Sequence, residues 1–373
     1  MSENAPKSIL VVAAHFFPNT SPRALRATEL AKQLTATGNR VTLLTTHTGA
    51  VIDEFAKQHG IDLLDLGSPF FKDMDTQGPM ALFKRAIRRI LLMAIEFPDI
   101  QYLWLVRRKL KKLSGFDLMI SLAVPYPVHW GVAFARKRSW PIAACWVADC
   151  GDPYMLVKTD NFRKFFYFKF LEKYFSRKAD FIVIPQITML PNYYPEFHQK
   201  IRAIPQGFNF DDTPRAEYVP NAVPTFAFAG TFLHKIRNPR VLLEALAVIE
   251  KPFKMIVYTG DSSLLDDYRE KLGQRLEIRS LIPRKTLIKE LSKMDFLVNI
   301  GYDPVNQMPS KLIDYYIAGR PIFSFNMEDF NSEHLNAFLS GDHQRHALQL
   351  PDISKYDIRQ VAHSFLSLTD EIK

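Results

Sequence analysis

The hydrophobic positions of this chain form short, continuous apolar runs that alternate with stretches of helical periodicity. In the first half, a helical pattern over 23–37 follows the first apolar run. Continuous runs of Val, Ile and Leu are typical of strands that are buried on both faces of a parallel sheet. The alternation therefore predicts βαβ units and the α/β fold class. The predicted strands of this half are 9–14, 40–46, 63–66, 118–122, 142–147 and 181–184.

A polar stretch rich in proline, from 204 to about 224, separates this series from a second one. A chain of 373 residues is long for one hydrophobic core and comfortable for two. We therefore predict two doubly wound α/β domains. In the second domain, the predicted helices are 240–249, 263–272 and 284–293, and the predicted strands are 225–229, 253–258, 276–279, 296–300 and 322–325. A last helix is predicted over 356–373.

Composition narrows the class of protein and its partners. Hydrophobic residues make up 47% of the chain and charged residues 23%, as in ordinary globular proteins. The formal net charge is +9, and the isoelectric point is near 9.3. A positive balance of this size favours an anionic partner, which could be nucleic acid, anionic lipid or a phosphorylated substrate.

Apolar segments and cysteines bear on the location of the protein. No apolar stretch reaches the roughly 18 residues that a membrane-spanning helix needs. The run 9–14 is too short for a signal-peptide core. The two cysteines, Cys145 and Cys150, lack metal-type spacing, and the apolar surroundings of Cys145 favour a buried thiol over a disulfide. We expect a soluble or peripheral protein in a reducing cytoplasm, without a bound metal.

The segment 308–325 carries the most specific chemistry of the chain. Ser310 is suited to cap a helix that Gly319 ends. A helix start attracts anions, and Lys311 adds a full positive charge there. Asp314 follows one turn later on the same face. This set suits a nucleoside diphosphate, with the phosphates at the helix start and the ribose hydroxyls on the carboxylate. An ordinary capped helix with an acidic residue in an early turn is the alternative.

This segment resembles the nucleotide-sugar site of GT-B glycosyltransferases of the retaining family 4 type. The shared pattern is Pro-Ser-Lys-Leu-Ile-Asp-Tyr at 309–315, followed by Ala-Gly-Arg-Pro at 318–321. Many members carry a second acid eight positions before the first, where this chain has Asn306. The start of the chain is also similar, although Asn-Thr-Ser-Pro at 19–22 stands where a Gly-Gly pair is usual. The resemblance implies the GT-B fold, in which two Rossmann-like domains face a central cleft and the C-terminal helix returns to the first domain.

On this basis the first domain comprises 1–207 with the returning segment 355–373, and the second comprises 208–354. The family binds its nucleotide sugar in the second domain, where cations in the loop after the first strand grip the diphosphate. Of Lys235 and Arg237, Arg237 is the better match by spacing. The alternative is that this segment is an ordinary charged surface loop. The donor-binding residues that the resemblance implies are Gly230, Thr231, Lys235, Arg237, Gly260, Pro309, Ser310, Lys311, Leu312 and Asp314.

Two loops of the first half, 124–131 and 146–154, resemble the acceptor side of the family. They imply that His129 touches the donor sugar and that Asp149 or Asp152 holds or deprotonates the acceptor hydroxyl. The predicted catalytic residues are therefore Asp149, His129 and Arg237. The predicted acceptor-binding residues are Phe17, Arg23, Tyr126 and Asp152. A packed histidine at 129 and a plain Asp-Pro turn at 152 are the alternatives.

Two basic and aromatic segments, 82–95 and 102–113, have apolar residues at helical spacing. A basic amphipathic helix with aromatic residues suits an anionic membrane surface. Each Lys or Arg near such a surface adds about 1 kcal/mol. The residues 82–113 are therefore predicted to bind the membrane. Two core helices with solvated charges are the alternative.

The resemblance implies a glycosyltransferase that moves a sugar from a nucleotide-diphosphate donor to a hydroxyl of a lipid-linked or polysaccharide acceptor. It also implies retention of the anomeric configuration, no metal and no cofactor. The expected setting is lipopolysaccharide or capsule assembly on the cytoplasmic, inner face of the membrane. A nucleotide-sugar epimerase of the same fold is one alternative. A non-catalytic, basic nucleic-acid-binding protein is another, but the apolar strand pattern argues against nucleic acid as a partner.

Overall fold

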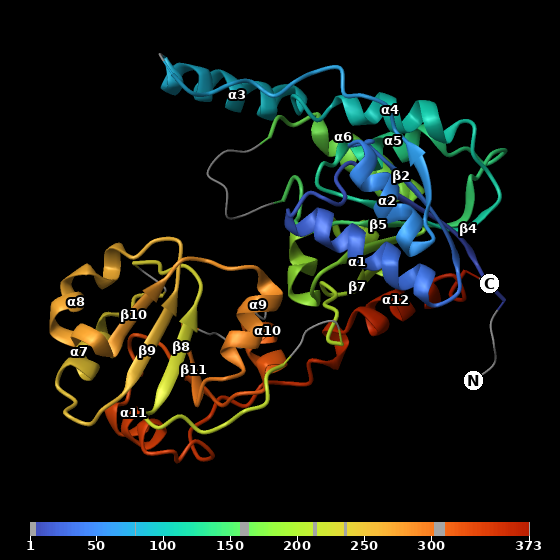
Figure 1. The fold of residues 1–373 in the computed structure, drawn as a ribbon. Helices are drawn as coiled ribbons and strands as arrows, with labels where there is room; N and C mark the ends of the chain where they lie inside the picture. The colour runs from blue at the N-terminus through green and yellow to red at the C-terminus, as the bar shows by residue number, and fades with distance from the viewer. Residues whose placement is uncertain are drawn as a thin grey trace. The chain divides into compact units, whose positions relative to one another are not determined.

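The chain forms two α/β units, each built around its own parallel sheet (Figure 1). The computed structural model describes residues 5–78, 80–156, 164–211, 215–234, 237–301 and 310–372. Unit 1 comprises Met1–Phe208 and Ser354–Lys373, and unit 2 comprises Asn209–Ile353.

The sheet of unit 1 has seven strands in the order β3-β2-β1-β4-β5-β6-β7, and every pairing is parallel. The central strand β1 pairs with β2 on one side and with β4 on the other. The strand order reverses between β1 and β4, and open α/β sheets bind ligands at the carboxyl ends of the strands beside such a point. The strands are β1 (Ser8–Ala13), β2 (Arg40–Thr45), β3 (Asp62–Asp65), β4 (Phe116–Leu122), β5 (Ala143–Asp149), β6 (Phe181–Ile184) and β7 (Ile201–Ala203).

Helices cover both faces of this sheet, which explains the continuous apolar runs in the sequence. Leu10 and Val12 of β1 enter one core, and Ile9 and Val11 enter the other, because successive side chains of a strand point to opposite faces. One face packs against α4 (Gln101–Leu110), α5 (Pro127–Ala135) and α6 (Phe168–Lys178). The other packs against α1 (Pro22–Ala36), α2 (Ala50–His59) and the last helix, α12 (Ile358–Ser367).

The sheet of unit 2 has five parallel strands in the order β10-β9-β8-β11-β12. They are β8 (Thr225–Ala229), β9 (Lys254–Tyr258), β10 (Leu276–Arg279), β11 (Phe296–Ile300) and β12 (Ile322–Phe325). The helices are α7 (Arg240–Ala247), α8 (Asp266–Leu272), α9 (Arg284–Leu291), α10 (Ser310–Ala318) and α11 (Ser332–Leu339). Here the strand order reverses between β8 and β11, so their carboxyl ends are the expected ligand-binding edge.

Some elements differ from the sequence-based prediction. The segment 124–131 was predicted as a proline-rich loop, but α5 begins at Pro127, because proline is tolerated in the first turn of a helix. The helices α2 and α11 and the short strand β7 were not predicted. The basic region 82–113 forms two helices with different surroundings. Helix α4 contributes five buried residues, whereas α3 (Ala81–Ile95) contributes none.

Candidate functional site

The candidate site of unit 2 lies at the carboxyl end of β8. Gly230 follows this strand with a φ of 136°, a conformation that side-chain-bearing residues rarely adopt. Further on, Leu233 N donates to Arg237 O at 3.2 Å and Arg237 N donates to Leu233 O at 2.9 Å. These paired backbone hydrogen bonds fix the position of Arg237 beside the sheet edge.

Helix α10 is anchored to the same edge by Tyr315. The Tyr315 hydroxyl accepts a hydrogen bond from Ala229 N at 2.9 Å and donates one to Val298 O at 3.1 Å. It therefore bridges the end of β8 and the middle of β11. Leu312 is fully buried on the core side of the helix. Tyr315 belongs to the predicted motif, but its role in positioning the helix was missed because it depends on two distant strands.

Lys311 and Arg237 bring two positive charges together at this edge. Burial, followed by the charge of Arg237, lowers the pKa of Lys311 to about 7. Among the described residues, neither Lys311 Nζ nor Arg237 Nε has a hydrogen-bond partner, although both atoms are buried. Lys311 Nζ lies 5.1 Å from the centre of the Phe228 ring. Buried polar groups are normally paired, so this pair of cations is chemically incomplete without an anion.

Asp314 lies one turn further along α10 and is held by an arginine from the neighbouring helix. Arg284 of α9 donates to Asp314 Oδ1 through Nε at 2.8 Å and approaches it through Nη2 at 2.6 Å. Burial raises the pKa of Asp314, and Arg284 only partly opposes this effect. The ion pair with Arg284 fixes the orientation of the Asp314 carboxylate. The pairing of Arg284 with Asp314 was not predicted from the sequence, because it joins residues 30 positions apart.

The remaining predicted donor-binding residues are placed as follows. Gly260 comes two residues after β9 ends, and a Cβ there would lie 3.4 Å from Leu281 Cδ1. Thr231 is exposed beside Gly230. Lys235, Pro309 and the side chain of Ser310 lie outside the described residues, as does Asn306. Within the part that the structure describes, no three His, Cys, Asp or Glu side chains gather as metal ligands do.

In unit 1, Asp149 is fully buried and bound by two arginines of α1. Arg26 donates to both carboxylate oxygens, at 2.5 and 3.1 Å, and Arg23 Nη2 lies 3.1 Å from Oδ2. Burial opposes the ionisation of Asp149, but the two guanidinium groups outweigh it and lower the pKa of the carboxyl. The acceptor-activating role predicted for Asp149 does not fit this arrangement, because no oxygen remains accessible to a hydroxyl.

The two arginines also tie together several segments of unit 1. Arg26 donates to the backbone oxygens of Ile204 and Pro205 at 3.1 and 2.5 Å and lies over the Phe365 ring of α12. Arg23 donates to the backbone oxygens of Asp149, at 3.0 Å, and Ala123. Arg23, predicted to bind the acceptor, is therefore engaged in holding the ends of β4 and β5.

His129 is also fully buried. Its Nδ1 is 2.8 Å from Ser121 Oγ, and its Nε2 is 3.6 Å from Cys150 Sγ. Burial lowers the pKa of His129 to about 3, so the ring is neutral at physiological pH. The alternative of a packed histidine describes this geometry, and the predicted contact with a donor sugar does not. Both cysteines are buried free thiols, as expected for Cys145.

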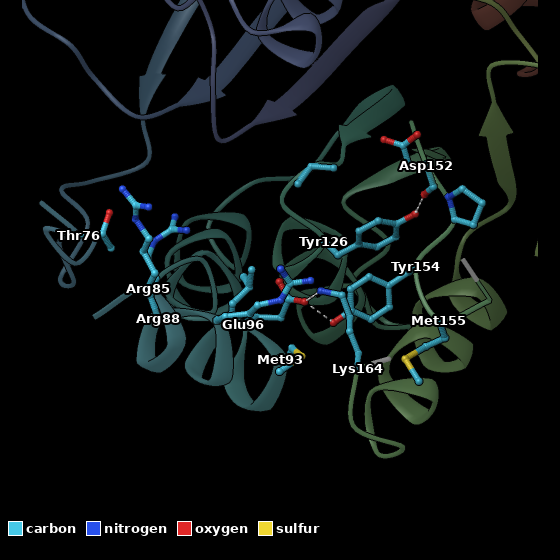
Figure 2. A pocket seen from close by; sticks show the side chains of 14 residues that line it. Thr76, Arg85, Arg88, Met93, Glu96, Tyr126, Asp152, Tyr154, Met155 and Lys164 are labelled. Carbon is cyan, nitrogen blue, oxygen red and sulfur yellow. Dashed lines mark hydrogen bonds and ion pairs between the residues drawn. The ribbon is translucent and has the colours of Figure 1, made fainter. Parts of the chain in front are cut away.

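Phe17, Tyr126 and Asp152 were predicted to bind the acceptor. Phe17 stacks on Phe55 of α2, with ring centres 4.4 Å apart. Tyr126 and Asp152 line a cavity that opens between α3 and the segments after β4 and β5 (Figure 2). The Tyr126 hydroxyl donates to the backbone oxygen of Asp152. The Asp152 residue itself is exposed. Of the predicted acceptor-side residues, these two are brought together at a cavity.

Solved structures of similar fold exist, although no protein-family model and no curated protein sequence matches the chain. A glycosyltransferase from Rickettsia africae is 15% identical, with a TM-score of 0.62 and 99% of each chain covered. The lipopolysaccharide outer core galactosyltransferase WaaB is 13% identical, with a TM-score of 0.54 and coverage of 98% of this chain and 99% of that one. HepE of Anabaena, in complex with UDP and glucose, is 12% identical, with a TM-score of 0.51 and 98% of each chain covered.

The chain has the GT-B fold. The similarity extends over nearly all of its length, and at this level of identity it shows the fold alone. The predicted pair of Rossmann-like α/β domains is confirmed, and so is the return of the last helix to the first unit, where α12 packs against α1. The roles of individual residues therefore rest on the geometry described above and not on the similarity.

Proposed function

We propose that this protein transfers a sugar from a nucleotide-diphosphate sugar to a hydroxyl of a lipid-linked or polysaccharide acceptor, with retention and without a metal. The observation that carries the proposal is a pair of cations, Lys311 and Arg237, whose Nζ and Nε atoms are buried without a partner among the described residues of unit 2. A diphosphate supplies the negative charge that this pair lacks. A guanidinium beside an ammonium suits phosphate oxygens.

The same pair would stabilise the reaction as well as the bound donor. In the transfer, the bond between the anomeric carbon and the diphosphate oxygen breaks, and the acceptor oxygen bonds to that carbon. The acceptor proton passes to a diphosphate oxygen. Negative charge grows on the leaving diphosphate as the first bond breaks. Cations fixed beside it, such as Arg237 and Lys311, interact more strongly with that state than with the intact donor.

Asp314 supplies the second contact of the proposed donor site. Its carboxylate is oriented by Arg284 and is one helical turn from Lys311. A ribose has neighbouring hydroxyls that donate to a carboxylate, and one turn of helix spans about 5 Å. This spacing supports an arrangement with the diphosphate at Lys311 and the ribose at Asp314.

The geometry of unit 1 decides which of its residues are proposed to contact the acceptor. Asp149 and His129 are buried and partnered, so neither is proposed to touch substrate. Asp152 is the exposed carboxylate next to the cavity of unit 1, and we propose that it orients the acceptor hydroxyl. A retaining transfer of the type described above does not require a side-chain base, because the diphosphate accepts the proton.

We further propose that α3 binds the protein to the inner face of a membrane, in lipopolysaccharide or capsule assembly. Figure 1 shows the N-terminal part of α3 extending beyond the other helices of unit 1. Its Leu82, Phe83 and Ile90 side chains are 81%, 62% and 55% exposed. Apolar side chains flanked by arginines suit an anionic bilayer surface. No helix among the described residues is long and apolar enough to cross a bilayer.

The names of two similar structures guide the first choice of donor. HepE was solved with UDP and glucose, and WaaB is described as a galactosyltransferase. UDP-glucose and UDP-galactose are therefore the first candidates in a thermal-shift screen of nucleotide sugars, with and without EDTA. A bound ligand raises the unfolding temperature by mass action. We expect at least one nucleotide sugar to do so in EDTA, and to release its sugar onto an added acceptor with the anomeric configuration retained.

The screen would refute the proposal if no nucleotide sugar stabilised the protein. Proton exchange at a sugar carbon in the absence of acceptor would instead identify an epimerase. Stabilisation that required a divalent metal would contradict only one part of the proposal, namely that the reaction needs no metal.

A further inference from the structure

The cavity of unit 1 has a volume of about 590 Å³ and lies between α3 and the carboxyl ends of β4 and β5 (Figure 2). One wall is a face of α3, where the lining positions recur at the three- and four-residue spacing of a helix. The opposite wall contains Tyr126 and the segment 152–155. Its volume is within the range of small-molecule sites, about 300–1,000 Å³. This cavity therefore has room for the polar part of a substrate.

The lining is basic. It contains four basic residues, Arg85, Arg88, Arg89 and Lys164, and two acidic ones, Glu96 and Asp152. The basic residues predicted to bind a membrane thus also form the wall of a cavity. In Figure 2 the Arg85 and Arg88 side chains lie at the end of the cavity beside Thr76, away from Asp152.

The charges of this cavity are unevenly neutralised. Arg88 forms a bidentate ion pair with Asp73, at 2.7 and 2.5 Å. Lys164 pairs with Glu96, which also accepts a hydrogen bond from Tyr154 at 2.8 Å. Among the described residues, Arg85 has no hydrogen-bond or ion-pair partner. Positive charge therefore remains at the α3 end, where an anionic ligand group would be bound.

The rest of the cavity indicates what else the ligand carries. At the opposite end, Tyr126 holds the backbone of Asp152, whose exposed carboxylate is an acceptor for hydroxyl groups. Apolar side chains, including Leu92 and Met93 of α3, also line the cavity. An adjoining face of α3 exposes Leu82, Phe83 and Ile90. A ligand with a hydroxyl, an anionic group and an apolar chain fits this sequence of surfaces.

We infer that the acceptor is a phosphate-bearing amphiphile and that this cavity binds it by its phosphate. Arg85 holds the phosphate oxygens, because a guanidinium group matches phosphate geometry. Asp152 accepts a hydrogen bond from the hydroxyl that receives the sugar, and the lipid chain leaves along the apolar face of α3. The inference rests on the proposed function and adds the chemical class of the acceptor.

The test uses octyl phosphate and octanol, both below their aggregation concentrations, as soluble probes of the full chain by calorimetry. Octyl phosphate should bind and octanol should bind at least about tenfold more weakly, since tenfold corresponds to the loss of one strong contact. Arg85→Gln should weaken octyl phosphate binding at least about tenfold. The matched control is Lys84→Gln, which removes the same charge from the same helix at a position outside the cavity lining.

Equal binding of octyl phosphate and octanol would overturn the inference, and so would equal losses in Arg85→Gln and Lys84→Gln. A second arm measures sedimentation with phosphatidylglycerol vesicles. If Arg85→Gln lost vesicle binding but kept octyl phosphate binding, Arg85 would serve a lipid headgroup and the assignment would be wrong. Nucleotide-sugar binding, measured on the same samples, separates this outcome from failure of the proposed function, because it depends on unit 2.

Discussion

At the scale of single residues, the charged clusters of the two units differ in whether their charges are neutralised. In unit 2, Lys311 Nζ and Arg237 Nε are buried, and neither atom has a hydrogen-bond partner in the part of the chain that the structure describes. In unit 1, Asp149 is buried with two arginines that neutralise it. A buried charge without a partner is costly, and a site that must bind an anion is a reason for it to persist. The first cluster is therefore suited to binding and the second to holding the fold.

The charge state of Lys311 should couple donor binding to pH. Burial lowers the pKa of its ammonium to about 7, and a bound diphosphate would raise it again. Between these two pKa values, binding takes up a proton. Affinity should therefore fall as the pH rises above about 7, by up to about tenfold per pH unit.

Calorimetry at about pH 8.5, in two buffers that differ in ionisation enthalpy, measures this proton uptake directly. A nucleotide sugar is the suitable ligand, because its diphosphate is a diester and does not itself titrate there. The uptake should disappear in Lys311→Gln. Heats that were independent of the buffer in the native protein would show that Lys311 does not meet the diphosphate.

Asp149 should matter for stability. Asp149→Asn leaves the Arg26 guanidinium buried with a weaker partner, and breaking a buried ion pair costs about 3–5 kcal/mol. We expect a loss of about 3 kcal/mol in the free energy of unfolding of unit 1, measured with denaturant. The control is Asp62→Asn, whose exposed pair with Arg40 should be worth less than about 1 kcal/mol. Comparable stability of the two variants would contradict this account of Asp149.

The donor motif could be recognised in the sequence, but the partners of its side chains could not be predicted. The stretch 309–315 was found because its pattern is local. The pairing of Asp314 with Arg284, and the two strand contacts of Tyr315, depend on residues far away in the chain. On the acceptor side, Asp149 and His129 occupy family-like positions, but burial, which a single sequence does not reveal, removes both from contact with substrate.

At the scale of elements, sequence patterns were most informative where both faces of an element are buried. Strands such as β6 and β8 have the predicted bounds, because continuous apolar runs mark them clearly. Elements with mixed faces were harder to recognise. Helix α5 is rich in apolar residues but begins with Pro127, and β7 is only three residues long. The basic segments 82–95 and 102–113 look alike in sequence, yet only α4 of the two is a core helix.

Helix α3 provides a prediction for membrane binding that is independent of its arginines. Changing Leu82, Phe83 and Ile90 to Ser removes exposed apolar surface and leaves every cation in place. Full burial of one such side chain is worth about 1.5–3 kcal/mol. Partial insertion of three should therefore contribute at least about tenfold to the affinity for phosphatidylglycerol vesicles.

Sedimentation with vesicles measures this loss, and Val248→Ser is the control, since Val248 is 80% exposed in unit 2. Unchanged vesicle binding by the triple variant would rule out insertion of α3. In that case its apolar face would need another partner.

At the scale of the whole molecule, the two units have separate hydrophobic cores and should respond separately to perturbation. Phe365 of α12 is fully buried in unit 1, far along the chain from the strands that it covers. Phe365→Ala should destabilise unit 1 by about 3–5 kcal/mol. In a calorimetric scan it should lower one unfolding transition, whereas a nucleotide sugar should raise the other. A single transition that responded to both changes would contradict this independence.

The measurement that tests the central claim most directly is the dissociation constant of the nucleotide sugar selected by the thermal-shift screen. It is compared by calorimetry between the native protein, Lys311→Gln, Arg237→Gln and the control Lys289→Gln, which lies exposed on α9. Hydrogen bonds to charged groups are worth about 1.5–3 kcal/mol, so each site variant should bind at least about tenfold more weakly. The control should bind as the native protein does. If both site variants kept native affinity while folded, the nucleotide sugar would bind elsewhere, and the donor site described above would be wrong.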